Sequence, residues 1–224
     1  MIIMKRNYQK ELDKTLDQIR GDNALPGLLL HSCCAPCSSY VLEYLTDYFS
    51  VTMFYYNPNI TDEEEYLRRA AEQKRLIESL PVSHPVSFLE GRYEPERFLQ
   101  MARGLEAVPE GGERCRRCFA LRLSETAKTA EAGSFDYFTT TLTISPLKNA
   151  AILNEIGEQV AQGCRHTAFL NSDFKKKNGY KRSVELSQIY GLYRQDYCGC
   201  IYSRQERERQ RKKSGEANRD EITI

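Results

Sequence analysis

The sequence lacks any hydrophobic segment long enough to cross a membrane. No apolar run in its 224 residues approaches the roughly 20 residues that a membrane-spanning helix needs. The first residues, MIIMKRNYQKELDK, become charged too early for a secretory signal peptide. These two absences predict a cytoplasmic protein with no membrane among its partners.

The sequence also lacks the glycine-rich loops that bind nucleotide phosphates. A short apolar run at residues 27–31 is expected to be a buried strand, and a loop then leads into a helix, which is how phosphate-binding folds begin. That loop, residues 31–37, reads HSCCAPC and contains no glycine, and neither the Walker pattern nor G-x-G-x-x-G occurs. The use of ATP is therefore not expected, even for a fold related to the ATP pyrophosphatases.

An excess of one charge is lacking too, because 32 basic residues nearly balance 31 acidic residues and leave a formal net charge of +1. Composition alone therefore does not indicate a nucleic-acid-binding protein. Basic residues are locally dense at positions 114–122, 175–182 and 204–213. Such runs can follow phosphates, but they are more often solvated faces, so both interpretations stay open.

What the sequence does contain is eight cysteines. A cytosolic protein rarely holds structural disulfides, so clustered cysteines there indicate metal binding or redox catalysis. Cys164 stands alone and is expected to be a small buried hydrophobic residue. The other seven fall into three tight groups: Cys33, Cys34 and Cys37; Cys115 and Cys118; Cys198 and Cys200.

The spacing of the seven cysteines allows more than one metal centre. Side chains that are adjacent in an extended segment point to opposite faces, so Cys33 and Cys34 could serve two centres. An iron–sulfur cubane takes four thiolates, and the remaining three are enough for part of a second metal site or for a dithiol. Structural zinc, which needs only four ligands, is the main alternative.

Apolar runs alternate with amphipathic segments along the chain. We expect strands at residues 27–31, 51–56, 85–89, 135–142 and 166–170, and helices at residues 5–20, 61–80, 94–107, 116–132, 148–162 and 182–193 and around residues 41–45. Thr61 and Glu64 form a potential capping box at the start of the 61–80 helix.

This alternation predicts an α/β domain with a mainly parallel sheet flanked by helices. We expect an N-terminal helical region at residues 1–24, a metal-binding catalytic domain at 25–203 and a charged tail at 204–224. Ligands of parallel sheets bind beyond the carboxyl ends of the strands, where the first cysteine group and several polar motifs are expected to lie. The sequence therefore predicts a cysteine-rich metal site at that edge of the sheet.

Six motifs follow one another along the chain: HSCCAPC at 31–37, YNPNI at 56–60, CRRC at 115–118 with Arg122 and Leu123 after it, TTTLTISPLKN at 139–149, DFKK to GY at 173–180, and YCGC at 197–200. In this order they resemble the QueH-type epoxyqueuosine reductases, over roughly residues 25–203. The resemblance implies a fold similar to the nucleotide α-hydrolase-like (HUP) domains.

The resemblance also implies an oxidoreductase that removes the epoxide oxygen of epoxyqueuosine in tRNA. That reaction takes two electrons and two protons and yields queuosine and water. The implied cofactors are a [4Fe–4S] cluster and an adjacent mononuclear metal, expected to be iron, without cobalamin. The implied partners are the anticodon loop of a tRNA that carries epoxyqueuosine and an external electron donor.

Residue roles follow from the same resemblance. Cys34, Cys115, Cys118 and Cys200 are the first choices for the cluster, which leaves Cys33, Cys37 and Cys198 for the second metal. The candidate proton donors are His31, Asp173 and Tyr180, although His31 is equally well explained as a packed loop residue. Candidate substrate contacts are Asn57, Asn59, Thr141, Ser145 and Lys148 for the base, and Lys175, Lys176, Lys181 and Arg182 for phosphates.

Two other functions remain compatible with these residues. One is an iron–sulfur-dependent tRNA thiolation enzyme, which would require ATP and a nucleotide loop. The other is a zinc-stabilised RNA-binding module without catalytic activity. Metal content and the requirement for ATP distinguish both from a reductase.

Overall fold

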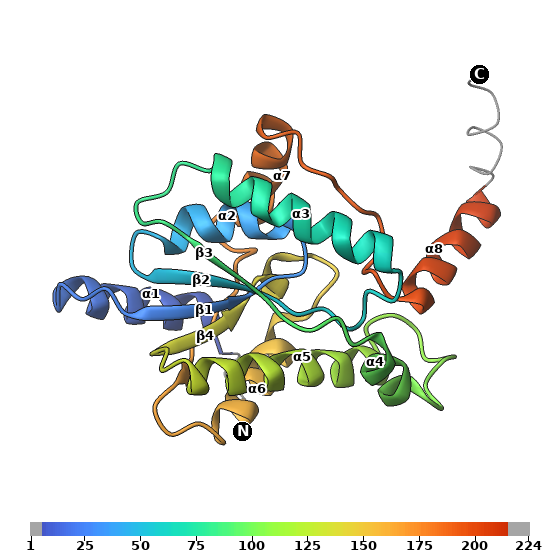
Figure 1. Ribbon diagram of the computed structural model, residues 1–224, viewed down its shortest axis with the longest axis horizontal. Helices are drawn as coiled ribbons and strands as arrows, with labels where there is room; N and C mark the ends of the chain where they lie inside the picture. The colour runs from blue at the N-terminus through green and yellow to red at the C-terminus, as the bar shows by residue number, and fades with distance from the viewer. Residues whose placement is uncertain (1–5, 215–224) are drawn as a thin grey trace.

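The sheet at the centre of the molecule has five strands, and they are all parallel (Figure 1). The computed structural model describes residues 6–214. The strands are β1 (Gly27–His31), β2 (Ser50–Tyr55), β3 (Ser87–Glu90), β4 (Tyr137–Thr140) and β5 (Ala168–Phe169), in the order β3-β2-β1-β4-β5. The prediction of an α/β fold with a parallel sheet is therefore confirmed.

Helices cover both faces of this sheet, with α2, α3 and α7 on one side and α5 and α6 on the other (Figure 1). The helices are α1 (Tyr8–Gly21), α2 (Ala35–Leu45), α3 (Glu63–Ser79), α4 (Pro95–Ala102), α5 (Glu113–Ala132), α6 (Ala150–Ala161), α7 (Gly179–Ile189) and α8 (Ile201–Ser214), with a 3₁₀ turn, η1, at Thr141–Ile144. Within the described part of the chain, no helix combines the length and the apolar character that crossing a membrane requires.

The central strand explains why both faces need cover. Leu28, Leu29 and Leu30 of β1 are all fully buried, which is the continuous apolar pattern typical of an inner parallel strand. Leu28 and Leu30 pack in one core with α1 and α2, whereas Leu29 packs in another with Ala127 and Ala130 of α5. The alternation of side chains along β1 thus holds the two helical layers together.

Several element boundaries differ from the predicted ones. Helix α3 is capped by Asp62 rather than Thr61, and the Asp62 carboxylate accepts a hydrogen bond from the backbone N–H of Glu65 at 3.2 Å. Three consecutive glutamates then occupy the first turn, where the helix dipole favours negative charge. The predicted strand 135–142 divides into β4 and the turn η1, and the predicted helix 94–107 ends at Ala102.

The two ends of the chain are described only in part. The expected junction between residues 24 and 25 falls between α1 and β1, and the expected junction after residue 203 falls inside α8. Residues 1–5 of the expected N-terminal region and 215–224 of the expected tail lie outside the described residues.

Gly179 makes the packing of α7 against α2 testable. A Cβ atom at this first residue of α7 would overlap the carbonyl oxygen of Phe174 and the ring of Tyr40. Because a backbone oxygen cannot easily move away, Gly179→Ala is expected to lower the free energy of unfolding by about 2 kcal/mol, as overpacking does. The measurement is the midpoint of urea denaturation followed by circular dichroism.

The matched control is Gly21→Ala at the end of α1, where a Cβ atom would meet nothing within 4 Å. This control is expected to keep or slightly raise the stability, because alanine restricts the unfolded chain. Equal midpoints for Gly179→Ala and the unsubstituted protein would contradict the packing described here.

Candidate metal centre

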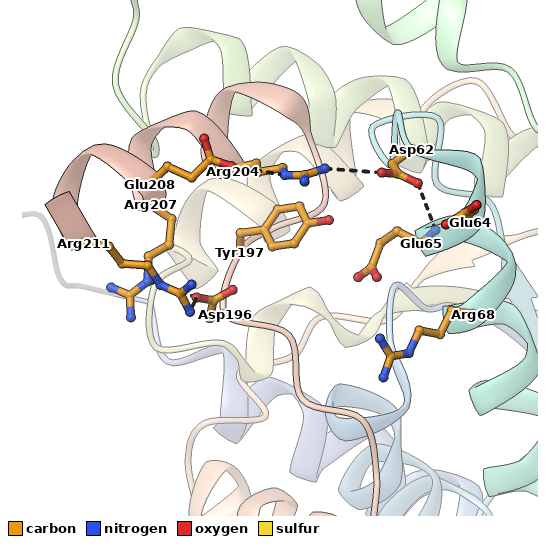
Figure 2. Close-up of a pocket in the computed structure, with 10 residues that line it drawn as sticks. All are labelled: Asp62, Glu64, Glu65, Arg68, Asp196, Tyr197, Arg204, Arg207, Glu208 and Arg211. Carbon is orange, nitrogen blue, oxygen red and sulfur yellow. Dashed lines mark hydrogen bonds and ion pairs between the residues drawn. The ribbon is translucent and has the colours of Figure 1, made fainter. Parts of the chain in front are cut away.

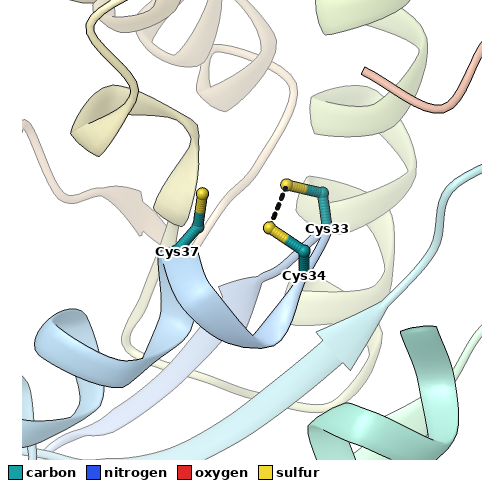
Figure 3. Close-up of side chains that lie close together, drawn as sticks. All are labelled: Cys33, Cys34 and Cys37. Carbon is teal, nitrogen blue, oxygen red and sulfur yellow. Dashed lines mark hydrogen bonds between the residues drawn. The ribbon is translucent and has the colours of Figure 1, made fainter. Parts of the chain in front are cut away.

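The first cysteine group lies where the chain leaves β1 and enters α2 (Figure 3). The sulfur atoms of Cys33, Cys34 and Cys37 all lie within 4.8 Å of one another, and the Sγ atoms of Cys33 and Cys34 are 3.8 Å apart. Three sulfur atoms this close, on cysteines that form no disulfide, can bind a single metal ion. We call Cys33, Cys34 and Cys37 the thiol triad.

The triad corrects the expectation that Cys33 and Cys34 face opposite sides. Strand β1 ends at His31, and Cys34 is already the N-cap of α2, so the alternation of a strand does not extend to this pair. The chain turns between the two elements, and that turn brings both sulfur atoms to the same side. A rule for extended backbone therefore could not decide where these two thiols point.

Hydrogen bonds within the triad separate the acidities of its members. Donation from Cys33 and Cys37 holds the pKa of the Cys34 thiol well below its usual range. The same hydrogen bonds, together with burial, raise the pKa of the Cys37 thiol well above its usual range. The start of helix α2 also favours a negative sulfur at this position. The triad is thus suited to bind a cation through Cys34 first.

The other four clustered cysteines line a second cavity, with about 330 Å³ of space when the part open to solvent is included. Cys115 and Cys118 are three residues apart near the start of α5 and therefore lie on one face of the helix. Cys198 and Cys200 come from the segment before α8 and flank Gly199, whose φ of +109° suits glycine. We call Cys115, Cys118, Cys198 and Cys200 the four-thiol group.

Burial and backbone donors characterise the four-thiol group. Burial raises the pKa of the Cys118 thiol to about 12, so a metal ion is needed to hold this sulfur as a thiolate. The backbone N–H of Gly111 donates to Cys115 Sγ at 3.3 Å, and that of Ser203 donates to Cys200 Sγ at 3.4 Å. Such donors stabilise metal-bound thiolates and tune the potential of iron–sulfur sites.

The two groups adjoin each other through Cys198. This residue lines the cavity of the four-thiol group and also a larger, open cavity whose wall contains the whole thiol triad. Cys33 and Cys34 additionally pack with Phe119 and Leu123 of α5, the helix that carries Cys115 and Cys118. All seven clustered cysteines are therefore brought to two neighbouring cavities, as the edge-of-sheet argument anticipated.

Arg69, which the sequence did not single out, holds the Cys198 segment in place. Its side chain is only 1% exposed and donates to Glu65 at 2.6 Å and to the carbonyl oxygen of Cys198 at 3.3 Å. The amide of Asn59 also donates to the Cys198 carbonyl, at 3.5 Å. Nothing in the sequence distinguishes Arg69 from Arg68 beside it, because only the fold shows which of the two is buried.

The open cavity contains some of the predicted substrate residues. It has about 850 Å³ of space, including the part open to solvent. The predicted residues Ser145, Lys148 and Tyr180 line it, as does Tyr197, an aromatic residue that could stack on a base. Arg194, which the sequence did not single out, lines it as well. Burial alone would lower the pKa of Lys148, but the nearby sulfur groups of Cys198, Cys33 and Cys37 outweigh it and raise that pKa, so the amine stays protonated.

His31 lies below the cavities and not in their walls. Its side chain is fully buried, and Nε2 donates to the Tyr56 carbonyl at 3.1 Å while Nδ1 accepts from the Thr140 hydroxyl at 2.9 Å. Burial, reinforced by the charge of Arg122, lowers the pKa of His31 to about 3, so the ring is neutral. Both nitrogens are used to join β1, β2 and β4 at their carboxyl ends.

Three predicted base contacts are also buried. Asn57 donates to the Ser32 carbonyl at 2.8 Å, and Asn59 lines the cavity of the four-thiol group. Thr141 is fully buried in η1. None of the three lines the open cavity, so their positions favour support of the cysteine-bearing loops over direct contact with a base.

The predicted phosphate contacts divide into two kinds. Lys175 is bound to Asp173 at 3.2 Å and to the Thr143 carbonyl at 2.7 Å, and Arg182 is bound by two nitrogens to Glu43 at 2.6 and 2.9 Å. Lys176 and Lys181, in contrast, are exposed. The lysine run is therefore not one continuous phosphate-binding surface.

A third cavity, of mixed charge, lies between the start of α3 and α8 (Figure 2). Arg204 pairs there with Asp62 at 3.3 Å, and Arg207 and Arg211 pair with Asp196 at 3.3 and 2.8 Å. The basic residues of α8 thus anchor that helix to the body of the protein. Asp196 and Tyr197 belong to this cavity and to the open cavity beside the triad.

Comparison with known proteins gives one consistent result. Residues 28–206 match the family model described as epoxyqueuosine reductase QueH. The chain is 45% identical to epoxyqueuosine reductase QueH of Staphylococcus epidermidis, over 89% of this chain and 85% of the relative. It is 44% identical to that of Streptococcus pyogenes, over 89% and 78%. The protein of the same name from Thermotoga maritima is 32% identical, over 86% and 96%.

Proposed function

The chain belongs to the epoxyqueuosine reductase QueH family, and we propose that it reduces the epoxide of epoxyqueuosine in tRNA to an alkene. The reaction consumes two electrons and two protons and releases the epoxide oxygen as water. The observation that carries the proposal is the thiol triad in the wall of an open cavity, with the four-thiol group directly behind it. Reducing chemistry and substrate access thus meet at one place.

The two thiol groups match two cofactors. The four-thiol group supplies the four thiolates that a [4Fe–4S] cluster takes, and the thiol triad supplies three ligands to a single iron ion and leaves a coordination position open. When bound, these groups would supply electrons one at a time and a Lewis acid for the developing oxyanion. This grouping replaces the assignment implied by resemblance, because the sulfur of Cys34 lies with those of Cys33 and Cys37.

Tyr180 and Lys148 are the proposed polar groups for the epoxide oxygen. Of the three candidate proton donors, Tyr180 lines the open cavity, whereas His31 is fully buried and Asp173 is paired with Lys175. The Tyr180 hydroxyl is therefore proposed to deliver a proton to that oxygen. The ammonium of Lys148 offsets the negative charge that develops there.

The tRNA substrate must present its modified base unstacked, because the reacting atoms have to reach the triad. Tyr197 and Tyr180 offer aromatic surfaces in the open cavity, and Ser145 offers a hydroxyl. Lys176, Lys181 and Arg194 are exposed and are proposed to contact backbone phosphates. Asn57, Asn59 and Thr141 are proposed to support these loops from beneath.

The decisive experiment combines metal analysis with turnover. Protein purified without oxygen is analysed for iron, sulfide and zinc, then chemically reduced and incubated with epoxyqueuosine-containing tRNA, and the nucleosides are identified by mass spectrometry. We expect iron and sulfide in the protein and a nucleoside that has lost one oxygen atom, without added ATP. An unchanged epoxide would contradict the proposal, while zinc alone or a need for ATP would favour the RNA-binding or thiolation alternative.

A further inference from the structure

Arg122 is a fully buried arginine whose two terminal nitrogens have no partner among the described residues. It lies one turn beyond Cys118 on α5, and its Nε donates to the Cys118 carbonyl at 3.3 Å. Nη1 and Nη2 are buried and make no hydrogen bond. No carboxylate pairs with this guanidinium in residues 6–214. The side chain thus brings a positive charge into the interior without a protein anion to pair with it.

Arg122 shares its cavity with four thiols, and with Glu110, Phe119 and other side chains. The residue lines the cavity of the four-thiol group. Burial lowers the pKa of Arg122, but the nearby sulfur groups of Cys118, Cys198, Cys33 and Cys115 more than offset that effect, so members of both cysteine groups lie close to its charge. The ring of Phe119 lies 5.6 Å from the guanidinium carbon and covers it on another side. The free nitrogens therefore belong to the space in which we place the cluster.

Arg114 offers a comparison for the terminal nitrogens of Arg122 within the same cavity. Arg114 lines the same cavity and is also buried, but its Nη1 donates to the carbonyl oxygens of Leu105, Glu106 and Val108. Arg114 therefore stabilises the loop before α5. Arg122 has no equivalent backbone partners for its terminal nitrogens, although it is fully buried.

Physical chemistry requires an anion for such a group. A buried guanidinium without a counter-charge is strongly destabilising, because it loses hydration and gains nothing in return. An iron–sulfur cluster held by four thiolates carries net negative charge, and its sulfur atoms accept hydrogen bonds. The cluster would therefore supply both the charge and the acceptors that Arg122 lacks.

We propose that Nη1 and Nη2 of Arg122 donate hydrogen bonds to sulfur atoms of the cluster bound by the four-thiol group, and that this raises its reduction potential. The inference rests on the proposed function and assigns a positioning role to a residue outside the ligand set. A positive charge beside the cluster stabilises the reduced cluster, which carries one more electron, and this raises the reduction potential. The planar fork of arginine offers two parallel donors, which a lysine ammonium cannot reproduce.

The test measures the reduction potential of the cluster in Arg122→Gln and Arg122→Lys by a mediated redox titration followed by electron paramagnetic resonance. Iron and sulfide are quantified per chain in every sample. For Arg122→Gln we expect reduction to become less favourable by about tenfold, which for a one-electron couple lowers the potential by about 59 mV. Arg122→Lys is expected to fall between this variant and the unsubstituted protein.

Arg117→Gln is the matched control. It removes the same charge from the same helix, but the side chain is 54% exposed and pairs with Glu113 at 2.9 Å. Solvent and salt screen such a charge, so the potential is expected to be unchanged. This control separates a specific effect of Arg122 from a general effect of net charge.

Each outcome bears on the proposal. If Arg122→Gln does not bind the cluster, the test depends on Arg122→Lys. A reduction potential in that variant that is lower than in the unsubstituted protein supports the proposal. The proposal is overturned if Arg122→Lys has the same reduction potential as the unsubstituted protein. It is also overturned if Arg122→Gln binds a full complement of iron and sulfide and keeps that potential. A shift of equal size in Arg117→Gln overturns it as well. An unsubstituted protein without iron and sulfide would instead overturn the proposed cofactor, which keeps the two failures distinct.

Discussion

Replacement of Cys118 by serine is expected to remove the iron–sulfur chromophore and to lower turnover by at least about 100-fold. Loss of groups that only orient metal ligands already costs about 10–100-fold, and loss of a ligand should cost no less. Cys118 is only 5% exposed and lies within the four-thiol group, so no solvent ligand can readily take its place. The measurements are iron and sulfide per chain, visible absorbance and the rate of epoxide loss.

Cys164→Ser is the control for this prediction. Cys164 lies outside both thiol groups, and its Sγ contacts the carbonyl oxygen of Ala127 at 3.8 Å, a role that a serine hydroxyl can fill. We expect unchanged metal content and turnover in this variant. A Cys118→Ser protein with full iron, sulfide and turnover would exclude the four-thiol group as the cluster site.

Replacement of Cys34 by serine is expected to have a different signature. The chromophore should persist, because the four-thiol group is intact, whereas about one iron per chain and at least about 100-fold of the turnover should be lost. Cys34 is the most acidic thiol of the triad, since hydrogen bonds from Cys33 and Cys37 lower its pKa. Iron and sulfide analysis, together with electron paramagnetic resonance of the reduced protein, checks the expectation.

The contrast between the two variants tests how the seven thiols are divided. If Cys34→Ser loses the chromophore as Cys118→Ser does, Cys34 is a cluster ligand, as the sequence resemblance first implied. If both variants keep their sulfide and their turnover, neither group holds a catalytic metal. The pair of substitutions therefore distinguishes the geometric grouping from the earlier assignment without requiring a structure of the loaded protein.

The lysine-rich segment shows why residue roles were harder to predict than the chemistry of the site. Lys175 and Lys176 are neighbours of the same type, yet Lys175 is bound to Asp173 and the Thr143 carbonyl while Lys176 is exposed. Arg69 and Arg122 present the same difficulty within α3 and α5, because charge in a helix normally indicates a solvated face. A charged residue identifies its partners only after distant segments have packed around it.

The sequence by itself determined the class of fold and the kind of chemistry. Apolar runs of strand length that alternate with amphipathic segments can be buried only as a sheet covered by helices, and a parallel sheet places its functional loops at one edge. Seven clustered thiols predict a metal centre, because thiolates are strong ligands for iron and zinc. Both arguments depend on local patterns, which a single sequence displays directly.

Only the tertiary structure decided how the thiols are grouped and which charges are buried. Cys118 and Cys198 are 80 positions apart and line one cavity, whereas the turn between β1 and α2 brings Cys33 and Cys34, adjacent in sequence, to one side. The physical reason is that the directions of these side chains depend on a turn and on helix packing across the sheet. Those contacts join segments too distant in sequence for local periodicity to reveal.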